Sequence, residues 1–288
     1  MIISRIIGGI GNQLFQFAAA RALSLEKKQN LSIDIRSFAS YNKHSGYIID
    51  KFFEVKPKIA TPEEIRSLLK FRSSQGILRI LSFIGSRYLC GKKLILEKNV
   101  YLKENINFFP APCYLYGYWQ SEIYFKKYEK VIRKDFKFKK KLSPQNKQVA
   151  NFISTSNSIG IHVRRGDYLM SKILNTCDKD YYLGAANFLA SLINKPNFFI
   201  FSDDPYWARS NIKLKFPTEF IDWNTGINST FDMHLFSLCK HQIISNSTFS
   251  WWGAWLNNNN LKKIIAPKKW FLDGRDDQYI CPSSWVRM

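Results

Sequence analysis

The stretch Ile159-Gly-Ile-His-Val-Arg-Arg-Gly-Asp-Tyr168 joins a short apolar strand directly to two adjacent arginines. In an α/β domain, ligands bind at the carboxyl ends of the strands. Arginine carries a permanent charge and a planar fork of donors that fits phosphate oxygens. Arg164 and Arg165 therefore predict an anion site at the end of this strand. A structural ion pair with Asp167 is the alternative that the stretch alone leaves open.

The residues after 144 alternate between apolar strands and helices. Alternation of this kind predicts a parallel sheet with right-handed crossovers. The expected strands cover 158–163, 197–201, 220–222, 242–245 and 263–266. The expected helices cover 180–192, the residues from Pro205 onward, 231–239 and 248–256.

The first half opens with a βαβ pattern: a strand over 2–7, a glycine-rich turn, a helix over 12–28 and a strand over 31–35. Beyond it, 40–60 looks irregular, 62–96 helical and basic, 99–118 strand-like, and 121–135 helical. The charged segment from Lys139 to Pro144 predicts a linker, with a new helix starting at its proline. At 288 residues the chain approaches the upper limit for one core. We therefore expect two α/β domains, 1–143 and 144–288, with a cleft between them.

Composition narrows the class of protein. The chain is 45% apolar and 16% aromatic, which excludes a disordered protein. Its five cysteines are scattered without zinc or redox spacing, and no secretory signal precedes them. They predict buried thiols in a reducing, cytoplasmic compartment. No stretch has the length and purity of a membrane span.

The net charge of +21 is concentrated in the first half, where residues 1–147 hold 28 basic and 11 acidic side chains. No acidic residue occurs between Glu64 and Glu97, where basic residues alternate with Leu, Ile and Phe. This pattern suits peripheral contact with an anionic membrane. Nucleic acid is the rival partner, and a merely solvated basic face is the third possibility.

Two further turns follow expected strands. Gly8-Gly-Ile-Gly-Asn-Gln13 lets the backbone approach a ligand, but it is neither a dinucleotide fingerprint nor a P-loop. Ser245-Asn-Ser-Thr-Phe-Ser250 fits a phosphate or ribose cradle, and equally a run of helix-capping residues. Helix N-termini at such turns offer N–H groups and a positive dipole to phosphates.

Together these elements resemble one family. Gly9–Gln16, His162–Asp167 and Ser245–Ala254 are similar to motifs of the bacterial α-1,2-fucosyltransferases of glycosyltransferase family 11, and the likeness extends to Phe201–Asp204 and Phe231–His234. The resemblance implies a GT-B fold of two Rossmann-like domains. It also implies inverting transfer of L-fucose from GDP-β-L-fucose to a galactose 2-hydroxyl, without a metal or other cofactor. The implied acceptor is a galactose-terminated or lipid-linked glycan, as in the synthesis of a surface polysaccharide such as O-antigen, at the inner face of the membrane.

The resemblance also assigns residues. Arg164 would stabilise the departing diphosphate, and His162 and Asp232 would contact the guanine or ribose. The alternatives are a buried structural histidine and a helix N-terminal acid. No carboxylate is marked by its spacing as the general base. Asp167 is the candidate, and a weak base or assistance from the phosphate is the alternative. The remaining donor contacts are Asn12, Gln13, Arg165, Ser247, Thr248 and Phe249. Arg165 and Asp167 are expected to orient the loop more than to bind directly.

Other conspicuous residues have structural explanations. We expect Trp251, Trp252 and Trp255 to pack in the core, since they lie at helical spacing. Asp203 and Asp204 suit either the donor or the cap of the next helix. In Asp178-Lys-Asp180, N-capping by Asp180 explains the motif better than a metal does. The alternative functions are a basic, non-catalytic protein that binds nucleic acid or glycan, and a fucosyltransferase of different linkage.

Overall fold

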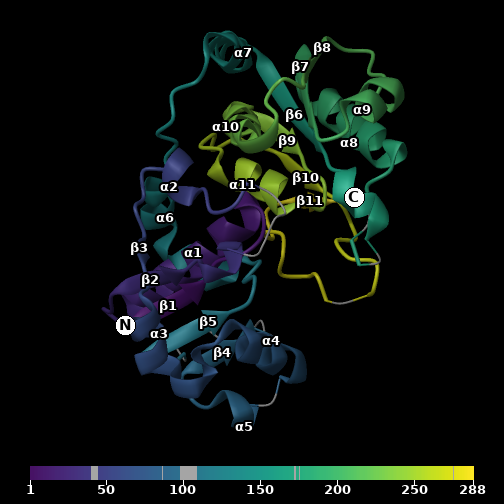
Figure 1. Cartoon of the computed structure of the whole chain (residues 1–288). Coiled ribbons are helices and arrows are strands. Elements are labelled where there is room, and N and C mark those ends of the chain that lie inside the picture. Colours follow the sequence, from purple (N-terminus) through teal and green to yellow (C-terminus); the bar gives the residue numbers. More distant parts are fainter. Residues whose placement is uncertain (40–44, 86, 98–108, 172, 175, 275) are drawn as a thin grey trace. The chain divides into compact units, whose positions relative to one another are not determined.

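The computed structural model describes residues 1–39, 45–85, 87–97, 109–171, 173–174, 176–274 and 276–288. The chain divides into two compact units, Met1–Lys139 (unit 1) and Lys140–Met288 (unit 2). Each unit is built on its own parallel sheet with helices packed against it (Figure 1). The expected class of two α/β domains is therefore confirmed. No helix in the described ranges is long and apolar enough to cross a bilayer.

The sheet of unit 1 has the order β3-β2-β1-β5-β4, and all its strand pairs are parallel. The central strand β1 pairs with β2 on one side and with β5 on the other. The strands are β1 (Ile2–Arg5), β2 (Leu31–Asp34), β3 (Lys58–Ile59), β4 (Leu94–Leu96) and β5 (Cys113–Tyr116).

The helices of unit 1 confirm the βαβ opening and correct the middle of the domain. They are α1 (Ile10–Glu26), α2 (Ile49–Phe52), α3 (Pro62–Leu69), α4 (Gln75–Ile84), α5 (Arg87–Cys90) and α6 (Glu129–Asp135). The 3₁₀ turns used below are η2 (Lys70–Ser73), η5 (Glu122–Tyr124) and η6 (Lys126–Tyr128).

The prediction that 62–96 is one helical segment was wrong. Lys70 has a φ of 54°, which ends α3, and Gly85 with a φ of 70° ends α4. Leu94–Leu96 is a strand that pairs with β5. The span 40–60 is also less irregular than expected, since it contains α2 and β3, while 40–44 and 98–108 lie outside the described residues. The segment 121–135 begins as two 3₁₀ turns rather than a helix.

The sheet of unit 2 has the order β11-β10-β9-β6-β7-β8. Counted from β6, this is the 3-2-1-4-5-6 order of Rossmann domains, so the chain reverses direction between β6 and β9. The strands are β6 (Asn157–Val163), β7 (Pro196–Ser202), β8 (Thr218–Ile221), β9 (His241–Ile243), β10 (Ile264–Ala266) and β11 (Val286–Arg287).

The helices of unit 2 match the predicted ones closely. They are α7 (Pro144–Thr155), α8 (Lys179–Leu192), α9 (Pro205–Asn211), α10 (Thr230–Leu238) and α11 (Thr248–Leu256), with the 3₁₀ turns η7 (Gly166–Met170) and η8 (Gly226–Ser229). The start at Pro144 is confirmed, and the Ser143 hydroxyl caps it by accepting from Asn146 N. At α8 the cap is Asp178 rather than Asp180, because the Asp178 carboxylate accepts from Tyr181 N at 2.8 Å.

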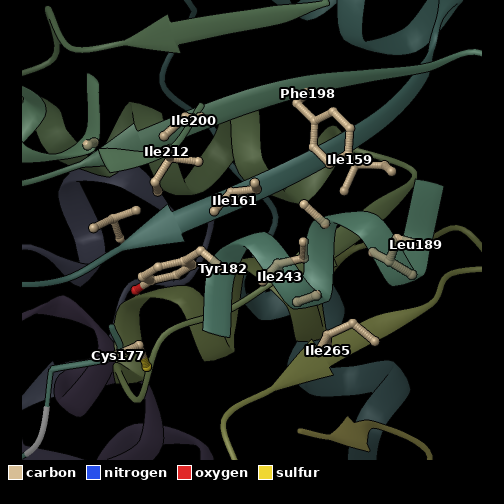
Figure 2. Packing of buried hydrophobic residues seen from close by; sticks show 14 residues of the cluster. Ile159, Ile161, Cys177, Tyr182, Leu189, Phe198, Ile200, Ile212, Ile243 and Ile265 are labelled. Atoms are coloured by element: carbon tan, nitrogen blue, oxygen red, sulfur yellow. The ribbon is translucent and has the colours of Figure 1, made fainter. Parts of the chain in front are cut away.

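One face of the unit 2 sheet packs against α8. Figure 2 shows Ile159 and Ile161 of β6 near Tyr182 and Leu189 of this helix, and all four side chains are completely buried. These contacts remove a continuous apolar layer from water, which is the main driving force for folding. They hold β6 rigidly in the middle of the unit.

The opposite face of β6 packs against Phe236 of α10. A Cβ atom at Gly160 would lie 2.8 Å from the Phe236 ring, and a Cβ atom at Gly253 of α11 would lie 2.6 Å from it. Both positions therefore require glycine, because only the missing side chains let α10 and α11 approach so closely. The three tryptophans of α11 are buried as expected (Trp251, Trp252 and Trp255), and all five cysteines are buried free thiols.

Candidate active site

The candidate site lies where the chain of unit 2 reverses direction across its sheet. His162 is at the carboxyl end of β6, and Ser245 follows β9 directly. The His162 Nδ1 and Ser245 Oγ atoms are 3.2 Å apart, and the Ser250 hydroxyl donates to the Ser245 carbonyl. The crevice outside the strand ends at this switch point is where open α/β sheets bind ligands.

A pocket of about 360 Å³ opens at this switch point, entirely within unit 2. The ends of β6, β7 and β8 contribute to it, as do α10 and α11. Its polar and aromatic lining includes His162, Arg164, Asp203, Asn224, Asp232 and Phe249. Four residues expected to contact a donor therefore lie around one cavity.

His162 is held as a neutral imidazole. Its ring stacks on Phe249 with centroids 5.0 Å apart and meets the edge of Phe236 at 6.1 Å. Burial, with a smaller contribution from the Arg164 charge, lowers the pKa of His162 to about 3. His162 is therefore buried, as the structural alternative predicted, and it also lines the pocket. A neutral imidazole can present one donor and one acceptor there.

Arg164 is the cation of the pocket, and two carboxylates currently hold it. Its Nη2 atom lies 2.7 Å from Asp167 Oδ1, and its Nη1 atom lies 3.1 Å from Asp203 Oδ2. Its Nε is buried and has no hydrogen-bond partner among the described residues. The Asp167 side chain is 58% exposed, so solvent screens that ion pair. An anion that entered the pocket could therefore replace Asp167.

Arg165 has a different environment. Its guanidinium lies 4.1 Å from the centroid of Trp207 and 3.3 Å from Asp204, and its backbone N–H donates to Asp203. Asp204 also caps α9 by accepting from Trp207 N at 3.0 Å. These contacts fix the loop after β6 to the start of α9, and Arg165 does not line the pocket.

Asp232 lies in the first turn of α10 and is buried. Its Oδ1 atom accepts from the Asn224 amide at 2.7 Å. Burial raises the pKa of Asp232 to about 7; the Asn224 hydrogen bond opposes this shift and the charge of Asp222 adds to it. The carboxyl group can therefore accept or release a proton near neutral pH. Asn224 had no marked role in the sequence, although its place just after an expected strand puts it at the binding edge of the sheet.

The three predicted donor contacts in the turn before α11 have different surroundings. Ser247 is buried, and its hydroxyl caps the helix by accepting from Phe249 N at 3.3 Å, as the capping interpretation predicted. Thr248 and Phe249 are partly exposed, but only Phe249 of these three lines the pocket.

The glycine-rich turn belongs to unit 1 and follows β1, the central strand of that sheet. Asn12 Oδ1 accepts from the Gln120 amide at 2.9 Å, which links the segments after β1 and β5. Glu97 follows β4, and its carboxylate accepts from the N–H groups of Tyr118 and Trp119 at 2.6 and 2.7 Å. Sequence reasoning missed Glu97 and Gln120, because neither lies in a recognisable motif.

Gln13 does not behave as the predicted ligand contact. Its side chain is completely buried. The amide nitrogen donates to the carbonyls of Gly8 and Gly46, and the amide oxygen accepts from Ile48 N. The expectation that this side chain contacts the donor is corrected: it fastens the glycine turn to the 46–48 segment.

Comparison with known proteins adds independent findings. The model of the family "Glycosyl transferase family 11" matches residues 1–287. The chain is 33% identical to the Escherichia coli "Alpha-1,2-colitosyltransferase" over 100% of this chain and 99% of that protein. It is 27% identical to the "O-antigen biosynthesis glycosyltransferase WbnK" of Escherichia coli, over 99% of both chains. Among solved structures, NodZ alpha-1,6-fucosyltransferase soaked with GDP-fucose superposes with a TM-score of 0.53 at 16% identity, covering 88% of this chain and 91% of that one. This structural likeness confirms the GT-B class of fold.

Proposed function

The chain belongs to glycosyltransferase family 11, and on that premise we propose that it transfers L-fucose from GDP-β-L-fucose to the 2-hydroxyl of a galactose residue. The anomeric configuration would be inverted and no metal ion would be needed. The observation that carries the proposal is the pocket of unit 2, which places a guanidinium, a neutral imidazole and a buried carboxyl group around one cavity at the Rossmann switch point.

The carboxyl group of Asp232 suits the guanine base. As a carboxylate it accepts two hydrogen bonds, and the N1–H and N2 amine of guanine present two adjacent donors. Asn224 already holds one carboxylate oxygen in place. In this proposal the stacked rings of His162 and Phe249 form the wall beside the ribose and the first phosphate. Phe249 is the apolar part of this wall and His162 is the polar part.

Arg164 would bind the diphosphate, with Thr248 at the N-terminus of α11 as a secondary contact. The acceptor hydroxyl oxygen forms a bond to C1 of the sugar while the bond from C1 to the β-phosphate oxygen breaks. The electron pair of that bond leaves with GDP, and a fixed cation is most effective where this charge develops. Release of Asp167 from Arg164 would free Nη2 for a phosphate oxygen, while Asp203 keeps Nη1 in place. Asp167 would then be a carboxylate available to take the acceptor proton.

Unit 1 would supply the acceptor side, with the linked amides of Asn12 and Gln120 following β1 and β5. The segments 36–60 and 99–120 would contribute further contacts to the glycan. The glycan itself would be a galactose-terminated unit of a surface polysaccharide, in keeping with the O-antigen role in the name of one relative.

A second donor is favoured by one observation, the 33% identity to a colitosyltransferase over the whole chain. Colitose is fucose without its 3-hydroxyl, so the same pocket could serve either GDP-sugar. The test is a panel of GDP-fucose, GDP-colitose, GDP-mannose and UDP-galactose against several galactose-terminated disaccharides, with EDTA present. We expect GDP release and an α-1,2 product with GDP-fucose. Turnover only with GDP-colitose would move the assignment to that donor, and turnover only with UDP-galactose would contradict it.

A further inference from the structure

Helix α4 of unit 1 carries large apolar side chains on its outer face. With one residue of the preceding 3₁₀ turn η2 they form what we call the α4 surface: Phe71 (69% exposed), Ile80 (58%), Phe83 (88%) and Ile84 (55%). Soluble monomers rarely gather exposed apolar groups without a binding role. This surface is separate from the pocket, which lies in unit 2.

The exposure follows from how α4 is anchored. Its other face buries Leu78 and Leu81 in a core that includes Ile65, Leu69 and Leu94, and Figure 1 shows the helix beside β4. Ser74 caps its start by accepting from Ile77 N. The helix is therefore fixed by one apolar face while a second one points outward. A helix that is apolar on both faces is typical of one that is covered on both.

The segment that carries the α4 surface has charges of one sign only. The sequence holds seven basic residues and no acidic residue between Glu64 and Glu97. In the structure Arg66, Lys70, Arg79, Lys92 and Lys93 are exposed. The guanidinium of Arg72 lies 4.6 Å from the centroid of the Phe71 ring, which places charge directly against the apolar group.

We propose that the α4 surface docks unit 1 onto the surface of an anionic lipid bilayer. The isoleucines and phenylalanines would enter the boundary between headgroups and acyl chains, and the surrounding cations would contact lipid phosphates. Nucleic acid would use the cations but would leave Ile80 and Ile84 without a role. An anionic bilayer would bind both the apolar side chains and the cations of the α4 surface. This inference does not depend on the identity of the sugar donor.

The test is co-sedimentation of the full chain with vesicles of phosphatidylglycerol and phosphatidylethanolamine, against vesicles of phosphatidylcholine alone. We expect binding to the anionic vesicles at low salt and at least tenfold weaker binding to the neutral ones. The double variant Ile80→Ser/Phe83→Ser removes the apolar groups and retains every charge, so we expect at least a tenfold loss of vesicle affinity. Arg79→Glu should weaken binding less, and more at low salt than at high salt.

A matched control is Leu261→Ser, which removes an equally exposed apolar group (82%) in unit 2 and should leave vesicle binding unchanged. Circular dichroism and the GDP affinity of unit 2 report whether each variant is folded. Three results would overturn the proposal: no vesicle binding by the unmodified chain, equal binding by the double variant, or a lipid-free dimer that the double variant abolishes. Tight oligonucleotide binding that survives in the double variant, without vesicle binding, would assign the charge to nucleic acid instead.

Discussion

The imidazole of His162 lies against the ring of Phe249 with an interplanar angle of 28°, so the end of β6 and the first turn of α11 share one aromatic contact. Stacked pairs of this kind contribute about 1 kcal/mol beyond buried area. We therefore expect Phe249→Ala to weaken GDP binding about tenfold, since His162 loses its support and the pocket loses a wall. Titration calorimetry with GDP measures this. Phe249→Tyr keeps the stacked ring and should bind nearly as the unmodified chain does; equal affinity in the alanine variant would contradict the assignment.

The neutral state of His162 makes stability depend on pH. Its pKa is about 3 in the fold and about 6.5 in an unfolded chain. Below pH 6.5 only the unfolded chain takes up the proton, so the stability due to this residue is complete above that pH and is lost as pH falls. Between pH 7.5 and 5.5 the chain should lose about 1.4 kcal/mol more free energy of unfolding than His162→Gln does. Urea unfolding at both pH values measures the difference. Parallel pH slopes would show that His162 titrates normally.

The raised pKa of Asp232 predicts that nucleotide binding, and not only stability, depends on pH. Its pKa is about 7, so the group is mostly protonated at pH 6 and mostly ionised at pH 8. Guanine needs the ionised form, and GDP affinity should rise about tenfold over this range. In Asp232→Asn the phosphates of GDP still titrate but the carboxyl group is gone. That variant should bind weakly and lose the additional rise; a rise of the same size in both proteins would exclude Asp232 as the guanine contact.

Arg164 is expected to act on the chemical step. Loss of a fixed donor from developing charge lowers turnover by about 10²- to 10³-fold, and Arg164→Ala removes the whole fork, so turnover should fall by at least about a thousandfold. Arg164→Lys keeps the charge without the fork, so its turnover should lie between that of the unmodified chain and that of Arg164→Ala. Arg133→Ala is the matched control, since it breaks an ion pair with Glu129 in α6 of unit 1. Thermal unfolding should be nearly unchanged in all three, and near-normal turnover by folded Arg164→Ala would remove Arg164 from the mechanism.

Gln13 should affect stability and not nucleotide binding. Gln13→Leu keeps the volume but leaves the buried Gly8 carbonyl and the buried Ile48 N–H without this partner, at about 3 kcal/mol of unfolding free energy. The GDP affinity of the folded variant should be unchanged, because the pocket lies in unit 2. Asn12→Ala is the comparison: it should retain most of the stability and lower turnover. A large loss of GDP affinity in Gln13→Leu would restore the original interpretation of Gln13 as a donor contact.

The sequence predicted unit 2 better than unit 1 for a physical reason. Strands such as β6 and β7 are buried on both faces and seven residues long, so their apolar runs are unmistakable. The strands β3 and β4 have two and three residues. At that length only pairing with β2 and β5 distinguishes them from the helices beside them, and pairing is not a local property of the sequence.

The candidate site shows the same division. Residues at expected strand ends, such as His162 and Arg164, could be placed because topology brings strand ends together. The role of Arg165 in holding the loop was also predicted, from its place beside Arg164. The role of Gln13 could not be predicted, since it depends on which neighbours its side chain meets. Asn224 reaches Asp232 only because η8 turns back toward α10, and no spacing in the sequence encodes that approach.

The ring of Phe236, seated between Gly160 and Gly253 and beside His162, anchors one wall of the pocket in the packed interior of unit 2. The wall made by β6 and α11 is continuous with the core of unit 2. A substitution there should therefore affect folding more strongly than it affects any preference for a sugar donor. Thr225, which also lines the pocket, is an exposed loop residue. If the pocket binds the donor as proposed, substitutions at Thr225 should change donor preference at less cost to folding than substitutions in the aromatic wall.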